Sequence, residues 1–187
     1  MLTRRRFLSG LVLLSLAQNG FASPSSQSVL KQLQKIDANI LLMRHALAPG
    51  FGDPNGFDIT QCDTQRNLDS RGRKQATARG QDFRNSGVKF DAIYSSQWCR
   101  CMETAKLLNM GAVQPFAGLN SFFEEYAERV ETLQKLEQRF STLNTNALCL
   151  MVTHQVVIQA VSKLTVSSGQ CVGYNVQTKQ AIKLRID

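Results

Sequence analysis

Residues 39–46, NILLMRHA, determine how the rest of the chain is interpreted. A short unbroken apolar run ends in Arg44 and His45, and a loop rich in Gly, Pro and Asp follows. An apolar run bounded by turn residues predicts a strand that is buried on both faces of a sheet. Because ligands of open α/β sheets bind beyond the carboxyl ends of the strands, Arg44 and His45 lie where chemistry is expected.

The chain has only one other histidine, His154, and it closes a second apolar run, LCLMVTH at residues 148–154. A single histidine after a strand is more often a satisfied loop or core residue than a catalyst. Two buried-type strands that both end in histidine, with Arg44 beside the first, favour a functional site.

A third motif, SSQWCRCMETA at residues 95–105, follows a strand and runs into a helix. It places Arg100 in the first helical turn, where the backbone N–H groups already favour an anion. A guanidinium group at such a position can hold two phosphate oxygens at once. If this motif stood alone, a surface arginine in a helix would be the safer interpretation.

Residues 1–22 are predicted to be an export signal. Three arginines at positions 4–6 precede a short apolar stretch, and small residues occupy the cleavage-site positions. The segment around the arginines also resembles a twin-arginine motif, and an ordinary secretory signal is the alternative. No cysteine directly follows the apolar stretch, so a lipid anchor is not expected. We therefore expect a periplasmic or secreted protein without a stable membrane anchor.

The remaining residues, 23–187, are expected to form a single domain. Removing the three arginines of the signal lowers the net charge from +8 to +5. This excess is moderate and lacks a dense basic block, so nucleic-acid binding is not favoured. A positive balance suits a small anionic substrate.

The five cysteines bear on the compartment and on metal binding. Cys149 lies in an apolar run and is predicted to be a small core residue. In an oxidising compartment, a Cys62–Cys99 disulfide would fix the long loop after the first strand over the site. No spacing typical of a zinc site is present, so no metal is expected.

Alternating patterns along the chain predict an α/β fold, a three-layer α/β/α sandwich with a mostly parallel central sheet. The strands are expected at about 39–44, 90–96, 113–116 and 147–153, with a terminal hairpin at 171–176 and 181–186. Helices are expected at about 28–37, 70–86, 97–109, 121–143 and 155–164. Asp69 or Ser70 is the predicted cap of the second helix.

Four motifs together resemble the histidine phosphatase (phosphoglycerate mutase-like) superfamily. They are RHA at 44–46, LDSRGRKQA at 68–76, SSQWCRCMETA at 95–105 and VTH at 152–154. They resemble the family's RHG, LTxxGxxQA, SSxxxRAxxTA and late strand-histidine motifs, and they occur in the same order. The short exported form is similar to bacterial periplasmic phosphatases, including a group that acts on phosphorylated heptose.

The resemblance implies a metal-independent, cofactor-free phosphatase. His45 would be the nucleophile that forms a phosphohistidine intermediate, and it must be neutral to attack. The cations Arg44 and Arg100 disfavour its protonated form. Arg44, Arg100 and His154 would hold the phosphoryl oxygens, because phosphoryl transfer needs mainly positioning and charge stabilisation.

The proton donor for the leaving group departs from the family pattern. Ser121 occupies the position where the family most often has glutamate. Glu124 is the predicted donor and Glu125 the second choice. Loop carboxylates could substitute: Asp53, Asp58 or Asp63. This deviation from the family motif would be tolerable if the substrate has a good leaving group.

Three alternative functions are consistent with these observations. The first is an exported phosphomonoesterase that hydrolyses a phosphorylated small molecule or sugar through His45. The second is a catalytically inactive relative that binds phosphate or a phosphoester, which the serine at position 121 makes a contender. The third and least favoured is a phosphoglycerate-type mutase, for which the chain lacks room for lid segments.

Overall fold

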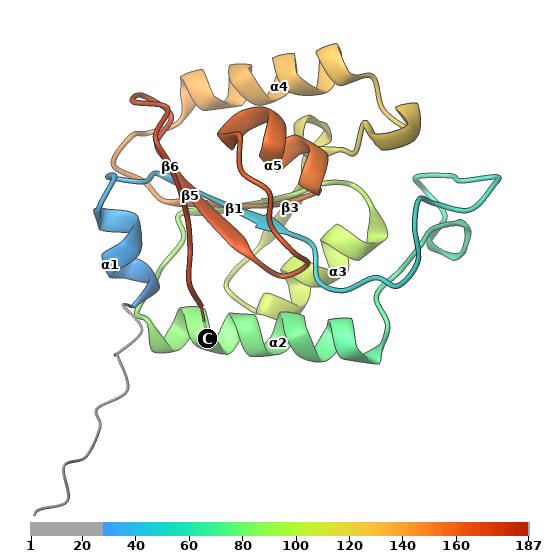
Figure 1. Ribbon diagram of the computed structural model, residues 1–187, viewed down its shortest axis with the longest axis horizontal. Helices are drawn as coiled ribbons and strands as arrows, with labels where there is room; N and C mark the ends of the chain where they lie inside the picture. The colour runs from blue at the N-terminus through green and yellow to red at the C-terminus, as the bar shows by residue number, and fades with distance from the viewer. Residues whose placement is uncertain (1–27, 187) are drawn as a thin grey trace, which may run out of the picture.

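A six-stranded sheet forms the middle layer of residues 28–186, the part of the chain that the computed structural model describes (Figure 1). The strand order is β3-β2-β4-β1-β5-β6. The first four strands in this order are mutually parallel, whereas β5 and β6 form the antiparallel hairpin expected at the end of the chain. The bounds are β1 Ile40–Arg44, β2 Ala92–Ser95, β3 Val113–Pro115, β4 Cys149–Thr153, β5 Cys171–Tyr174 and β6 Ala181–Lys183.

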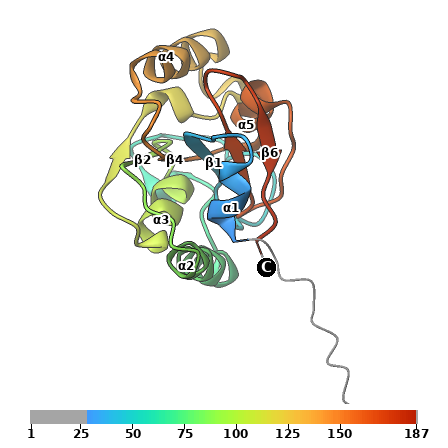
Figure 2. The same ribbon diagram turned by 90° about the vertical axis from the view of Figure 1, so that its left-hand side faces the viewer.

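Helices cover both faces of the sheet, as predicted (Figures 1 and 2). One face carries α1 Val29–Gln34, α2 Ser70–Asn85 and α3 Cys99–Leu108. The opposite face carries α4 Arg129–Thr142 and α5 Gln155–Ser162. Short 3-10 turns lie at η1 Cys62–Thr64, η2 Ala117–Leu119 and η3 Phe123–Glu125. The predicted export signal lies outside the described residues.

The apolar run of β1 fills both cores of this sandwich. Its side chains point alternately to opposite faces of the sheet, as they must in a strand. Leu41 and Met43 pack with α1, α2 and α3, while Ile40 and Leu42 pack with α4 and α5. All four side chains are fully buried. The strand therefore has no polar face, which explains why its sequence does not alternate.

The predicted helix at 121–143 is wrong over its first part. The structure begins α4 at Arg129, where the Glu128 carboxylate accepts the N–H of Val130. Glu124 and Glu125 have positive φ angles of 54° and 63°, which an α-helix does not allow. The aromatic residues of this segment therefore belong to the loop before α4 and do not extend its buried stripe.

Helix α2 begins as predicted, because the Asp69 side chain accepts the N–H of Gly72 at 2.8 Å. Two glycines let this helix approach its neighbours closely. A Cβ at Gly72 would lie 1.9 Å from the Leu47 carbonyl oxygen, and one at Gly80 would lie 2.1 Å from that of Leu108. Both contacts are with backbone, so a side chain at either position would push α2 away.

The Cys62–Cys99 disulfide is present, as predicted, and joins the long β1–α2 loop to the first residue of α3. The adjacent loop residue Gln65 reinforces the link, since its side-chain oxygen accepts the Cys99 N–H at 2.9 Å. Cys149 is buried in the core, as are Cys101 and Cys171. The loop is therefore attached covalently beside Arg100.

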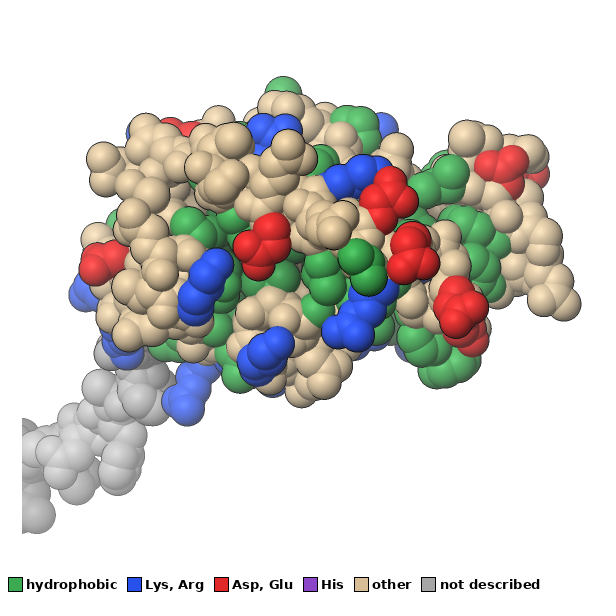
Figure 3. Space-filling view, turned by 90° about the horizontal axis from the view of Figure 1, so that it is seen from above, with side chains coloured by type: hydrophobic (Ala, Val, Ile, Leu, Met, Phe, Trp, Pro, Cys, Tyr) green, Lys and Arg blue, Asp and Glu red, His purple; other side chains and the backbone are tan. Residues whose placement is uncertain are grey.

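The face over α4 carries acidic and basic side chains intermixed with hydrophobic ones (Figure 3).

Within residues 28–186, none of the helices combines the length and the apolar character that a membrane crossing requires.

We predict that the double variant Cys62→Ala/Cys99→Ala is less stable than the oxidised wild type by about 4 kcal/mol, because the disulfide closes a loop with a sequence separation of 37. Urea unfolding of both proteins measures the difference. Adding a reductant should destabilise the wild type by a similar amount and leave the double variant unchanged. Equal stabilities of variant and oxidised wild type would contradict the prediction.

Candidate functional site

The two histidines meet because β1 and β4 are adjacent parallel strands. Arg44 pairs with Thr153 in the sheet register, so the next residue of each strand is a histidine. The His45 N–H donates to the Thr153 carbonyl at 2.9 Å, which extends the pairing by one bond. The two imidazole centroids are 5.4 Å apart. The structure therefore brings together two predicted site residues that lie far apart in the sequence.

His45 is held in one tautomer. Its Nδ1 lies 2.7 Å from the Ala46 carbonyl oxygen, which can only accept, so Nδ1 carries the hydrogen and Nε2 the lone pair. The side chain is 3% exposed. Burial, and then the charge of Arg100, lower its pKa from 6.5 to about 3. The ring is therefore neutral at physiological pH.

His154 lies against the start of the third motif. Its Nε2 is 3.0 Å from the Ser96 hydroxyl oxygen, and its ring packs edge-on against Trp98 with centroids 5.3 Å apart. Burial and the charge of Arg100 hold its pKa well below 6.5. Both histidines of the chain are thus neutral groups.

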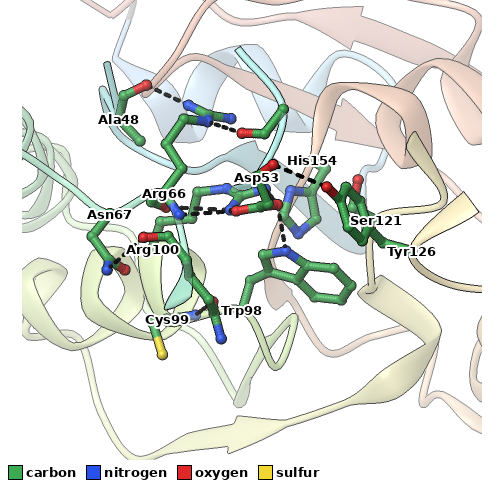
Figure 4. A network of polar contacts seen from close by, with 12 residues as sticks. Ala48, Asp53, Arg66, Asn67, Trp98, Cys99, Arg100, Ser121, Tyr126 and His154 are labelled. Carbon is green, nitrogen blue, oxygen red and sulfur yellow. Dashed lines mark hydrogen bonds and ion pairs between the residues drawn. The ribbon is translucent and has the colours of Figure 1, made fainter. Parts of the chain in front are cut away.

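Arg100 forms a buried ion pair with Asp53 of the long loop (Figure 4). Its two terminal nitrogens donate to the two carboxylate oxygens at 2.7 and 3.1 Å. The side chains of Arg100 and Asp53 are only 4% and 2% exposed. The bidentate geometry fixes the guanidinium plane, and its Nε is buried without a hydrogen-bond partner among the described residues.

The Asp53 carboxylate is fully engaged. Besides Arg100, it accepts the Trp98 indole N–H at 3.0 Å and the Arg66 backbone N–H at 3.0 Å. Burial by itself raises the pKa of this carboxyl, but the hydrogen bond and charge of Arg100 and the Arg66 N–H outweigh burial and lower it. Asp53 is therefore an anion that cannot readily donate a proton.

Two further arginines lie at the pocket. Arg44 donates to the Val166 carbonyl at 3.0 Å, and its Nε is likewise buried without a partner in the described residues. Arg66 donates to the carbonyls of Gly52 and Ala48 and so folds the loop around its own side chain. The sequence did not indicate Arg66, because nothing in the long β1–α2 loop shows which of its side chains turns inward.

Two further motif residues, Gln75 and Thr104, form hydrogen bonds that hold the segments around the site in place. The Gln75 side chain accepts the Leu47 N–H and donates to the Ser168 carbonyl, so it bridges two loops that flank the site. The Thr104 hydroxyl accepts the Ala46 N–H and donates to the Arg100 carbonyl. These bonds connect α2 and α3 to the residues that follow β1.

The site opens into a pocket of about 430 Å³. Arg44, His45, Arg100 and His154 all line it, as predicted for a common site. The other lining residues are Leu47, Ala48, Pro49, Gly50, Phe51, Gly52, Asp53, Arg66, Ser121, Phe123, Tyr126, Gln155, Val156 and Ser168.

Glu124, the predicted proton donor, does not line this pocket. Its side chain is exposed and approaches Gly52 at the rim. Glu125 and Asp63 are also exposed, and Asp58 accepts hydrogen bonds from Thr60 and Gln61 within its own loop. Of the predicted acids, only Asp53 reaches the pocket. Within residues 28–186, no cluster of three or more His, Cys, Asp or Glu side chains could hold a metal ion.

Comparison with known proteins finds a family match over the part of the chain that carries Arg44, His45 and Arg100. Residues 40–139 match the model of the histidine phosphatase superfamily (branch 1). The mitochondrial serine/threonine-protein phosphatase Pgam5 of Drosophila virilis is 32% identical over 78 residues, which cover 42% of this chain and 24% of that protein. Pgam5 of Drosophila mojavensis is 30% identical over the same length. The matched segment spans about a quarter of the length of these relatives.

Solved structures share the fold over most of the chain. The protein histidine phosphatase SixA complexed with tungstate has a TM-score of 0.55 at 11% identity, covering 78% of this chain and 94% of SixA. A mycobacterial glucosyl-3-phosphoglycerate phosphatase has a TM-score of 0.53 at 14% identity, covering 80% of this chain and 97% of that one. Given the family match from β1 into α4 and the shared architecture, this chain belongs to the histidine phosphatase superfamily.

Proposed function

We propose that the protein is a phosphatase that hydrolyses a small phosphorylated substrate through a phosphohistidine intermediate on His45. The observation that carries this proposal is the fixed tautomer of His45. The bond from Nδ1–H to the Ala46 carbonyl leaves the Nε2 lone pair free in a pocket lined by arginines. A neutral imidazole nitrogen with an available lone pair is the nucleophile that phosphoryl transfer to histidine requires.

The charge of the pocket matches the substrate. Arg44, Arg66 and Arg100 contribute three positive charges, Asp53 contributes one negative charge, and both histidines are neutral. The resulting balance of +2 complements a phosphate monoester dianion. Fixed cations in a partly buried pocket stabilise charge more effectively than they would in water.

Each residue then has a role in the proposed reaction. Arg44 and Arg100 line the pocket and hold the phosphoryl oxygens through their guanidinium groups. His154 lines the same pocket and is a further contact for the phosphoryl group. Asp53 is a positioning residue, since it acts on the substrate only through Arg100.

The proposal includes export. The Cys62–Cys99 disulfide supports it, since structural disulfides persist in oxidising compartments such as the bacterial periplasm. The arginine-rich start of residues 1–22 supports it independently.

We predict that His45→Ala lowers kcat for a generic aryl phosphate at least about 10³-fold, because it removes the nucleophile. In the wild type, a brief reaction with a ³²P-labelled substrate should trap label that is stable to alkali, labile to acid and absent from His45→Ala. Retained binding of inorganic phosphate, measured by calorimetry, is the control for an intact pocket.

Full activity of His45→Ala would exclude the nucleophile assignment. Tight phosphate binding by the wild type, without turnover or a trapped intermediate on any phosphoester, would instead favour the inactive binding relative.

We predict that neither histidine titrates between pH 8 and 5 in the folded protein. Imidazole NMR resolves this simply, because the chain contains only two histidines. The unfolded chain binds these protons near pH 6.5, but folded His45 binds its proton only near pH 3. The free energy of unfolding should therefore decrease as the pH falls below 6.5. The variant Arg100→Gln should raise the pKa of His45, because it removes a neighbouring positive charge. A titration midpoint near pH 6.5 for either histidine of the folded wild type would refute the prediction.

We predict that Asp53→Ala lowers the free energy of unfolding by about 3–5 kcal/mol, because it leaves the buried Arg100 without its counter-ion. Chemical denaturation measures the change. Glu131→Gln is the matched control, since it removes the carboxylate from an exposed pair with Lys135 and should change stability little. Similar effects of the two substitutions would show that the buried pair is not formed in solution.

A further inference from the structure

Two aromatic side chains stand exposed at the mouth of the pocket. Phe51, from the β1–α2 loop, is 84% exposed, and Phe123, from η3, is 36% exposed. Their rings pack edge to face with centroids 5.2 Å apart, and both line the pocket. Of the four large hydrophobic side chains that are exposed within the described residues, these are the two that share one site. An exposed apolar patch at a pocket mouth marks a ligand-binding surface.

Besides the charged and histidine side chains, the polar residues that line the pocket are Ser121, Tyr126, Gln155 and Ser168. The Ser121 oxygen accepts the Phe123 N–H, and the Tyr126 hydroxyl donates to the Asp53 carbonyl. Leu47, Pro49 and Val156 contribute apolar surface. Gln155 is occupied, since its oxygen accepts the Val166 N–H and its nitrogen donates to the Leu164 carbonyl. A hydroxyl-rich leaving group bound here would lose hydrogen bonds to water and regain only some of them, which costs free energy. A flat apolar group incurs no such loss.

No carboxylate that is free to donate a proton is among the described residues that line the pocket, although Glu124 approaches Gly52 at the rim. Among the described residues that line it, Asp53 is the only carboxylate, and both of its oxygens are bound by Arg100. Glu124 is exposed outside the lining. A positioned general acid typically accelerates such a reaction 10²–10⁴-fold. A substrate of this pocket therefore benefits from a leaving group that departs as an anion.

We propose, building on the proposed phosphatase function, that the substrates are aryl phosphates. In these monoesters the phosphoryl group is bonded directly to a phenolic oxygen. The ring packs on Phe51 and Phe123 while the arginines hold the phosphoryl group. A phenol has a pKa near 10, several units below that of an alcohol, so a phenolate leaves without a proton from the protein.

The proposed chemical step balances without an acid. The P–O bond to the ring breaks as the bond from His45 Nε2 to phosphorus forms, and the electron pair stays on the phenolate, which takes a proton from solvent. Water then attacks phosphorus. The P–N bond breaks, its electron pair returns to Nε2, inorganic phosphate leaves, and the proton from water passes to solvent.

Three probes separate ring recognition from leaving-group quality. 4-Nitrophenyl phosphate has both a ring and a good leaving group, acetyl phosphate has a good leaving group without a ring, and benzyl phosphate has a ring on a poor leaving group. We expect kcat/KM to fall in that order, with benzyl phosphate at least about 10³-fold below 4-nitrophenyl phosphate. A series of substituted phenyl phosphates should show a rate that rises steeply as the phenol pKa falls.

Variants at the mouth test the ring contact. Phe51→Ala, and the double variant with Phe123→Ala, should raise KM for 4-nitrophenyl phosphate about 3- to 10-fold, the usual worth of an aromatic contact. KM for acetyl phosphate should stay unchanged. Val130→Ala, which removes an exposed side chain that does not line this pocket, is the matched control and should affect neither substrate.

Benzyl phosphate turned over as well as 4-nitrophenyl phosphate would overturn the aryl assignment while leaving the phosphatase intact. So would a loss of benzyl phosphate turnover of 100-fold or more in Glu124→Gln, which would identify Glu124 as the missing acid. Unchanged KM in both phenylalanine variants would refute the ring contact. Absence of turnover and of phosphohistidine with every probe would remove this inference together with the proposed function.

Discussion

The buried ion pair between Arg100 and Asp53 is the interaction on which the site depends. Burying two charges is costly unless geometry and additional hydrogen bonds compensate. Here the pairing is bidentate, and Trp98 and the Arg66 backbone satisfy the carboxylate further. The pair joins a long loop to the start of α3. It therefore converts a segment with little regular structure into one wall of the pocket.

Several weaker contacts hold the same loop in place and make the pair possible. Phe57 stacks on Trp98 with centroids 5.0 Å apart, and the Tyr126 hydroxyl donates to the Asp53 carbonyl at 3.0 Å. The disulfide to Cys99 adds a covalent link one residue before Arg100. Each contact lowers the entropy that the loop would otherwise lose when Asp53 docks. The sheet positions the histidines, and this loop positions the charge around them.

The sequence was sufficient to predict the site residues that lie at the ends of strands or at the start of a helix. Arg44, His45 and His154 end buried strands, and hydrophobic patterning identifies such strands reliably. Parallel neighbours then bring their carboxyl ends together. The order of the motifs indicated Arg100, and its place in the first turn of α3 follows from the strand before it.

The loop segments could not be predicted in the same way. The inward turn of Asp53 and Arg66 depends on contacts with residues more than 30 positions away or with backbone carbonyls, which leave no local pattern. The helix predicted at 121–143 began too early because Phe123 and Tyr126 happen to continue its apolar spacing. They face the long loop instead, against Phe51 and Phe57. Aromatic residues that serve a pocket can thus imitate those that serve a core.

The two glycines of α2 have a consequence for how this protein can diverge. One sits against the carbonyl of Leu47, two residues after His45, and the other against the carbonyl at the far end of α3. Together they set the spacing of three segments without touching the pocket themselves. A side chain at either position is therefore incompatible with the present place of α2. Even alanine at position 72 or 80, the smallest possible enlargement, would misalign reactive groups on other segments.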